Sequence, residues 1–142
     1  MLIRGSCHCG NISYRLDWRP DATEIPARAC SCSFCTRHGG VWTSCPDGEL
    51  LIAVRDAARV SNYSFGTRTA EFHVCAVCGV VPVVTSRIEG NTYAVVNVNT
   101  MENVAPSMLQ RAASNFDGED EAARLRRRAK NWIGRVRYAS AG

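Results

Sequence analysis

Hydrophobic and polar residues alternate along several stretches of the first hundred residues. In ISYRLDW, residues 12–18, the hydrophobic side chains occupy every second position, which is typical of a strand with one buried face. Alternation or short apolar runs predict further strands in residues 50–54, 69–75, 80–84 and 93–99. Pro82 should restrict its strand to a sheet edge or a bulge, because proline has no backbone N–H group. The chain is therefore predicted to be mainly β.

Two segments depart from this pattern. Residues 19–29, RPDATEIPARA, contain two prolines and little periodicity, and we expect a loop there. Residues 117–134 have helical periodicity, with Asp117 as the expected N-cap, acidic residues in the first turn and Arg and Lys towards the end. The arginines of this helix are best explained as a solvent-exposed face that complements the helix dipole. A contact surface for phosphate or nucleic acid is the alternative.

Composition narrows the class of protein. A chain of 142 residues with 46% hydrophobic and 21% charged residues has the size and balance of a single globular domain. It contains no apolar run of membrane-spanning length and no signal peptide pattern, so we expect a cytoplasmic protein without a membrane partner. The net charge of +4 is modest, and no aromatic residues are interleaved with the C-terminal arginines. Nucleic acid is therefore not an expected partner.

Eight cysteines are the most informative feature of the composition. In a reducing compartment, clustered cysteines are more often metal ligands than disulfides. A C-x-C pair directs both thiolates to one side of an extended backbone, and a C-x-x-C turn followed by glycine does the same. The cysteines fall into four groups, which are Cys7 with Cys9, Cys30 with Cys32 and Cys35, Cys45 alone, and Cys75 with Cys78.

These groups predict two zinc sites. Zinc prefers four tetrahedral ligands, and the two pairs together supply a closed structural site made of Cys7, Cys9, Cys75 and Cys78. CSCSFC, residues 30–35, presents three thiolates and leaves one corner for a small molecule, which is the arrangement of a catalytic zinc. We therefore expect two zinc ions per chain.

The role of Cys45 leaves alternatives open. If Cys45 completes the second site, both zinc ions are structural and the protein is a non-catalytic, zinc-stabilised binding module. The same four sulfurs could hold an iron–sulfur cluster, although their spacing does not match the usual ferredoxin runs. In the favoured interpretation Cys45 is a small apolar core residue on a strand over VWTSC, residues 41–45.

The cysteine motifs also carry a family resemblance. GSCHCGNISY, CSCSFCTRHGG and CAVCG, within about residues 3–100, resemble the glutathione-dependent formaldehyde-activating enzyme (GFA) family, whose domain is shared with centromere protein V. The resemblance implies a β-tent of small antiparallel sheets around a structural zinc, here followed by a C-terminal helix. It implies a carbon–sulfur lyase that adds glutathione to formaldehyde, giving S-hydroxymethylglutathione, and the reverse. Cys7, Cys9, Cys75 and Cys78 match the structural site, and Cys30, Cys32 and Cys35 match the catalytic site.

Residues next to CSCSFC are candidates for the substrate pocket. His38 titrates near neutrality and is the candidate for proton transfer, with a pocket-wall role as the alternative. Arg37, Gly39 and Gly40 resemble the segment that lines the pocket of the family. Arg68 and Arg87 are candidate partners for the carboxylates of glutathione. After CAVCG the chain reads VVPVVTS, which departs from the family pattern, so the sequence predicts a small-molecule thiol and aldehyde without identifying the thiol.

Overall fold

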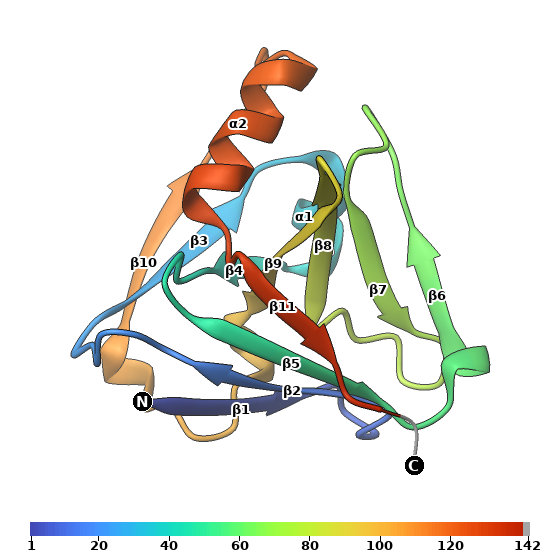
Figure 1. Cartoon of the computed structure of the whole chain (residues 1–142), viewed down its shortest axis with the longest axis vertical. Helices are drawn as coiled ribbons and strands as arrows, with labels where there is room; N and C mark the ends of the chain where they lie inside the picture. Colours follow the sequence, from blue (N-terminus) through green and yellow to red (C-terminus); the bar gives the residue numbers. More distant parts are fainter. Residues whose placement is uncertain (141–142) are drawn as a thin grey trace.

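The computed structural model describes residues 1–140 and contains two β-sheets and two α-helices. The four-stranded sheet has the order β1-β2-β5-β11, and the seven-stranded sheet has the order β10-β3-β4-β9-β8-β7-β6. The strands of the smaller sheet run across those of the larger one (Figure 1), and α2 contacts β8 of the larger sheet. The predicted mainly β fold with a C-terminal helix is confirmed.

The strands are β1 Leu2–Ser6, β2 Ile12–Asp17, β3 Ile25–Cys30, β4 Val41–Thr43, β5 Glu49–Val54, β6 Val60–Tyr63, β7 Glu71–Cys75, β8 Val83–Ile88, β9 Asn91–Asn97, β10 Leu109–Ser114 and β11 Arg135–Tyr138. The helices are α1 Ser33–His38 and α2 Glu121–Asn131. Short 3-10 turns occupy Ala57–Arg59, Val98–Thr100 and Pro106–Met108. Within residues 1–140, no helix is both long and hydrophobic enough to cross a membrane.

Strands form at or near the predicted residues in β2, β5, β7 and β9, whereas the run at residues 80–84 overlaps β8 only at Val83 and Val84. In β2, Ile12, Tyr14 and Leu16 are buried while the residues between them are more exposed. Pro82 lies just before β8, which pairs with both β7 and β9, so the predicted edge position is wrong. Because Pro82 precedes the first residue of the strand, the strand needs no hydrogen bond from its nitrogen.

The loop predicted for residues 19–29 is wrong in its second half, where β3 begins at Ile25. Ile25 and Ala27 are buried on one face, and β3 pairs in parallel with β10, more than eighty residues further along the chain. β11 likewise pairs in parallel with β5, so both sheets are mixed rather than purely antiparallel. The two prolines obscure the alternation, and the distant partner strand stabilises β3.

The C-terminal helix begins later than predicted. Asp120, not Asp117, is the N-cap of α2, and its side chain accepts a hydrogen bond of 2.7 Å from the backbone N–H of Ala123. Gly118 has a φ of 84° and places a turn between Asp117 and the helix. Immediately after α2, Ile133 forms a bridge to Ala94 of β9. This bridge fixes the helix end against the larger sheet.

Three separate groups of buried side chains form the interior. The largest lies between the sheets and includes Leu16, Leu50 and Val96. A second group contains Cys35 with Trp42, Phe72, Val84 and Val95, and a third contains Cys7 and Cys75 with Ile12. The two cysteine clusters are therefore surrounded by different side chains, which are aromatic and aliphatic around Cys35 and aliphatic around Cys7 and Cys75.

Candidate functional site: two cysteine clusters and a cavity

The first cluster joins two distant turns of the chain. Cys7 and Cys9 follow β1, Cys75 ends β7 and Cys78 lies in the next turn, and their four Sγ atoms lie within 4.8 Å of one another. The Sγ atoms of Cys7 and Cys9 are 3.8 Å apart, and those of Cys9 and Cys75 are 3.5 Å apart. Zinc–sulfur bonds of about 2.3 Å in a tetrahedron require edges of about 3.8 Å. The cluster therefore fits a zinc ion closed on all four corners.

Backbone donors orient the sulfurs of this closed cluster. The N–H of Ile12 donates to Cys7 Sγ at 3.3 Å, and the N–H of Cys78 donates to Cys75 Sγ at 3.5 Å. These hydrogen bonds hold the two sulfurs in place, as hydrogen bonds to metal ligands commonly do. Gly79 has a φ of 80°, which a side chain would strain, so the glycine permits the turn after Cys78.

The second cluster is local to one turn of the chain. Cys30 ends β3, Cys32 is the N-cap of α1 and Cys35 lies within α1, and their three Sγ atoms lie within 4.8 Å of one another. The N–H of Cys35 donates to Cys32 Sγ at 3.4 Å, and the indole Nε1–H of Trp42 donates to Cys35 Sγ at 3.3 Å. Hydrogen bonding with Cys35, then with Cys32, and last the charge of Arg127 lower the pKa of Cys30 to about 5, against the opposing effect of burial.

This three-cysteine cluster is open at its fourth corner. Among residues 1–140, no further Cys, His, Asp or Glu ligand atom comes within 4.8 Å of all three sulfurs. Cys45 lies elsewhere, in the core between the sheets, where it is 5% exposed and its thiol donates to the carbonyl of Arg19 at 3.1 Å. The structure thus places Cys45 as a core residue rather than as a fourth ligand.

A cavity of about 410 Å³ adjoins the open cluster, and Cys30, Cys32 and Cys35 all line it. Its apolar lining includes the five aromatic side chains of Trp42, Phe65, Phe72, Phe116 and Trp132. Its cationic lining consists of Arg28, Arg124, Arg127 and Arg128. The volume lies within the range of about 300–1,000 Å³ that is typical of small-molecule sites.

Several residues predicted for the pocket do not line this cavity within the described part of the chain. The imidazole of His38 is exposed and packs against the Phe34 ring, with ring centroids 4.4 Å apart. Arg37 donates to the carbonyl of Ser33 at 2.8 Å, at the exposed surface of α1. Gly39 caps that helix with a φ of 72°, and Gly40 follows it. These residues shape α1 and the approach to β4.

The four arginines of the cavity were not among the residues predicted to line the pocket. Arg124, Arg127 and Arg128 belong to α2, which we expected to present a solvent-exposed basic face. That prediction is wrong for Arg128, which is 7% exposed. Arg68 and Arg87, the predicted partners for carboxylates, are exposed and are not among the described residues that line the cavity.

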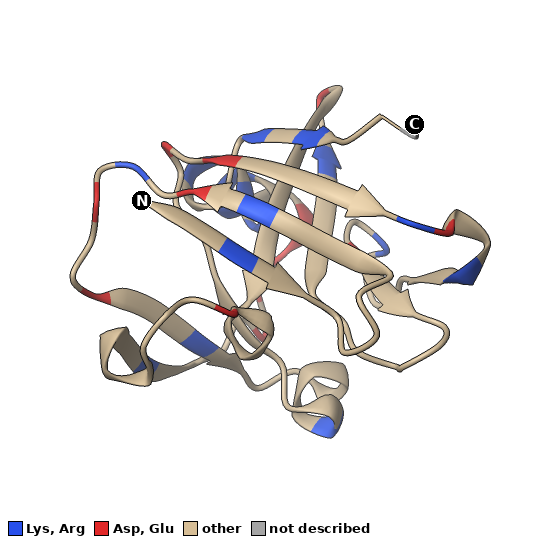
Figure 2. Cartoon of the chain, turned by 90° about the horizontal axis from the view of Figure 1, so that it is seen from below, with Lys and Arg blue, Asp and Glu red and all other residues tan. Residues whose placement is uncertain are grey.

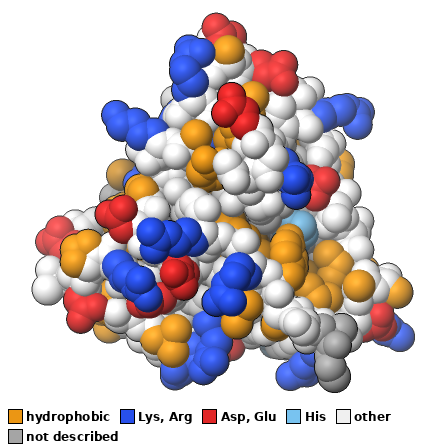
Figure 3. Space-filling model, viewed as in Figure 1, with side chains coloured by type: hydrophobic (Ala, Val, Ile, Leu, Met, Phe, Trp, Pro, Cys, Tyr) orange, Lys and Arg blue, Asp and Glu red, His pale blue; other side chains and the backbone are white. Residues whose placement is uncertain are grey.

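The remaining charges are dispersed. Basic and acidic segments both occur along the four-stranded sheet (Figure 2). On the face seen in Figure 3, side chains of opposite charge intermingle over this sheet. The arginines that line the cavity are therefore the clearest grouping of cations beside a candidate site.

Two comparisons relate this chain to known proteins. Residues 2–117 match the family model described as glutathione-dependent formaldehyde-activating enzyme. A crystal structure of a Rhodobacter sphaeroides protein is similar to this chain, with 33% sequence identity and a TM-score of 0.53. The match covers 73% of this chain and 92% of that protein. Both cysteine clusters lie within the segment matched by the family model.

Proposed function

Because the chain belongs to the glutathione-dependent formaldehyde-activating enzyme family, we propose that it is a zinc-dependent carbon–sulfur lyase that forms and cleaves the adduct of a thiol and an aldehyde. The adduct of glutathione and formaldehyde, S-hydroxymethylglutathione, is the proposed substrate. The observation that carries the proposal is the three-cysteine cluster, which has an open corner and lines a cavity of small-molecule size.

The two clusters would hold zinc for different purposes. Cys7, Cys9, Cys75 and Cys78 would hold a structural ion, and Cys30, Cys32 and Cys35 would hold the ion of the active site. A zinc ion bound by three thiolates supplies a soft electrophilic centre that favours the thiolate form of a substrate thiol or polarises an aldehyde oxygen. Three thiolates leave such a centre about one unit negative, and Arg127 and the neighbouring arginines offset this charge.

The chain itself would position the reactants. Trp42 holds Cys35 through the hydrogen bond from its indole N–H and also lines the cavity, so it links the ligand set to the substrate space. The aromatic lining excludes water from the sulfur and the carbonyl carbon. In the forward direction a carbon–sulfur bond forms, the thiol loses its proton and the carbonyl oxygen gains one, and the reverse reaction restores thiol and aldehyde.

Proton transfer by His38 remains a prediction. His38 is the titratable group next to the open cluster in sequence, but its ring lies against Phe34 and outside the residues that line the cavity among those described. This placement gives the role no geometric support. A general acid or base contributes roughly a hundredfold to ten-thousandfold to the rate, so substitution of His38 distinguishes the alternatives.

The proposal is tested by measuring the rate of adduct formation from glutathione and formaldehyde, for example by NMR exchange, with the zinc-loaded protein. We expect a rate above that of the uncatalysed reaction, lost in Cys30→Ser and retained in Cys45→Ala, which is the matched control because Cys45 lies in the core. If the zinc-loaded protein fails to accelerate the reaction with this or any other thiol, the binding-module alternative replaces the lyase.

A further inference from the structure

Part of the cavity wall comes from the end of the chain. The family match ends at residue 117, yet Arg124, Arg127, Arg128 and Trp132 line the cavity that contains the three-cysteine cluster. Arg28 of β3 lines the same cavity. We call Arg28, Arg124, Arg127 and Arg128 the arginine subsite. The first question is how many of these charges the protein neutralises itself.

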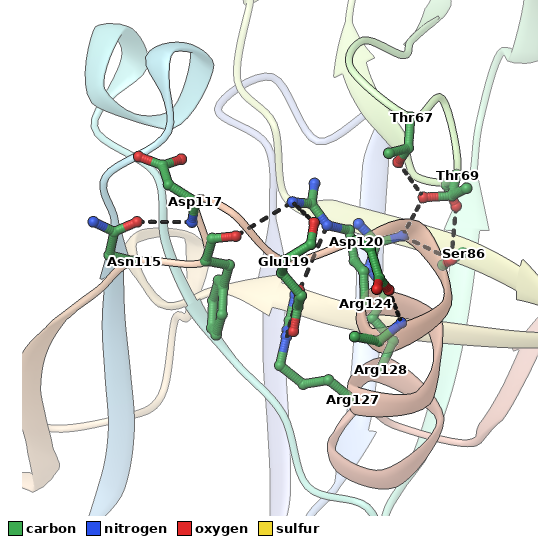
Figure 4. Close-up of polar contacts among 12 residues, drawn as sticks. Thr67, Thr69, Ser86, Asn115, Asp117, Glu119, Asp120, Arg124, Arg127 and Arg128 are labelled. Carbon is green, nitrogen blue, oxygen red and sulfur yellow. Dashed lines mark hydrogen bonds and ion pairs between the residues drawn. The ribbon is translucent and has the colours of Figure 1, made fainter.

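One carboxylate serves two arginines of the subsite. Arg127 Nε lies 3.1 Å from one carboxylate oxygen of Glu119, and Arg124 Nε lies 3.5 Å from the other (Figure 4). Arg127 also stacks over the Phe116 ring, with its guanidinium carbon 3.6 Å from the ring centroid. Glu119 therefore balances at most one of these two positive charges.

Arg128 is buried without any carboxylate partner. One of its terminal nitrogens donates to Thr69 Oγ1 at 2.8 Å and to Ser86 Oγ at 3.2 Å, as Figure 4 shows. Its Nε atom is buried with no hydrogen-bond partner among the described residues. Burial and the neighbouring arginines lower its pKa to about 10, which still leaves it protonated at neutral pH. The two hydroxyls fix the position of the guanidinium but contribute no negative charge.

Arg28 is similarly unpaired. It is partly buried, and among residues 1–140 no carboxylate oxygen lies within 4.0 Å of its guanidinium. Asp117 is the one carboxylate among the described cavity residues, and it forms no ion pair with Arg28 or Arg128. Glu119, Asp117 and the zinc-loaded open cluster together supply about three negative charges against the four arginines. Because a buried cation without a counter-charge destabilises a fold, the excess positive charge indicates that an external anion completes the cavity wall. Guanidinium groups suit this purpose because their planar N–H groups match carboxylate and phosphate oxygens.

We propose that the arginine subsite binds an anionic group of the substrate, a carboxylate or a phosphate, while the sulfur or aldehyde group of the same molecule is at the three-cysteine cluster. This inference rests on the proposed function and adds a requirement for a negative charge remote from the reacting sulfur. The aromatic side chains between these groups, including Phe65 and Trp132, would contact the carbon skeleton of the substrate. The C-terminal segment, beyond the family match, thereby determines specificity.

The experiment compares thiols with and without the anionic group. Glutathione is paired with its diethyl ester, in which both carboxylates are masked, and pantetheine 4′-phosphate is paired with pantetheine. Binding is measured by the fluorescence of Trp42 and Trp132, and the spectrum of the cobalt-substituted open cluster reports whether the sulfur arrives. A charge-assisted contact predicts that the anionic member of at least one pair binds about tenfold to a hundredfold more tightly. A difference within the glutathione pair identifies a carboxylate as the bound group, and a difference within the pantetheine pair identifies a phosphate.

Single Arg→Gln variants show which arginines cause the difference in affinity. Arg128→Gln and, independently of α2, Arg28→Gln should each abolish most of the difference between the members of the pair. Arg126→Gln should preserve it, because Arg126 is an exposed residue of the same helix that is not among the described cavity residues. Zinc content and the circular dichroism spectrum establish that each variant is folded, and Arg28→Gln keeps the test valid if Arg128→Gln does not fold.

The outcomes separate the two proposals. If both members of each pair change the cobalt spectrum and bind equally tightly, the arginine subsite is refuted and the proposed function stands. If the anionic members bind more tightly but leave the cobalt spectrum unchanged, the arginines do bind an anion, but the sulfur does not reach the open cluster and the proposed function is refuted. If no thiol binds at all, both are refuted.

Discussion

The closed and open cysteine clusters use the same ligand but differ in where their sulfurs come from. In the closed cluster, Cys9 and Cys75 are separated by 66 residues, and aliphatic side chains such as Ile12 surround the sulfurs. In the open cluster, the three sulfurs come from six consecutive residues and line a cavity with aromatic and cationic walls. The closed cluster therefore ties distant parts of the chain together, whereas the open cluster leaves a coordination position facing a cavity.

The largest effect should follow from breaking the closed cluster. Cys75→Ser removes a buried ligand that joins β7 to the turn after β1, and structural zinc contributes on the order of 10 kcal/mol to folding. We expect the variant to lose cooperative thermal unfolding and to release zinc. Persistence of a cooperative transition with one zinc ion per chain would show that the fold does not depend on this cluster.

The matched change in the open cluster should affect chemistry rather than folding. Cys32→Ser leaves two thiolates, and we expect zinc to fall from two ions per chain to one and adduct formation to fall by more than about a hundredfold. The thermal unfolding midpoint of Cys32→Ser should stay close to that of the wild-type protein when the closed cluster of each protein is equally loaded with zinc. Collapse of the fold, as in Cys75→Ser, would remove the distinction between the two clusters.

A smaller effect is expected from the hydrogen bond between Trp42 and Cys35. Trp42→Phe removes the indole N–H group whose nitrogen lies 3.3 Å from Cys35 Sγ. Loss of such a hydrogen bond to a metal ligand typically lowers metal affinity or activity by roughly tenfold to a hundredfold. Competition with a chelator should show weaker zinc binding at the open cluster and unchanged binding at the closed one. Trp18→Phe, in the core between the sheets, is the control for loss of packing. Equal weakening of both zinc sites in Trp42→Phe would mean that packing explains the result.

The smallest effect is expected at His38. Because its ring packs on Phe34 and does not line the cavity among the described residues, His38→Gln should change the rate by less than about threefold. The pH profile of the reaction between pH 5 and 8 should keep its shape. A loss of a hundredfold or more, with a lost titration near neutrality, would restore His38 as the proton carrier.

The cysteine clusters could be predicted from the sequence because their chemistry depends on short spacings. C-x-C and C-x-x-C direct sulfurs by local backbone geometry alone, and four sulfurs complete one zinc site in only a few ways. Alternation likewise predicts β2, because one of its faces is buried against the core. Both kinds of signal are contained within a few residues.

The features that could not be predicted from the sequence depend on contacts between distant segments. β3 is stabilised by its parallel pairing with β10, which no local pattern in residues 19–29 indicates. The amphipathic pattern of α2 predicts a helix, but it does not show that Arg128 would be buried against Thr69 and Ser86. The cavity wall consists of such long-range contacts, which explains why sequence reasoning placed the pocket on the residues next to CSCSFC.

X-ray absorption at the zinc edge tests the central claim most directly, because it counts sulfur ligands. For protein with two zinc ions per chain, one closed and one open cluster predict a mean of about 3.5 sulfurs per zinc, with the remainder from a lighter atom. Saturating glutathione should raise the mean to about four if its sulfur takes the open corner. A mean of four sulfurs before any thiol is added, unchanged afterwards, would contradict the account.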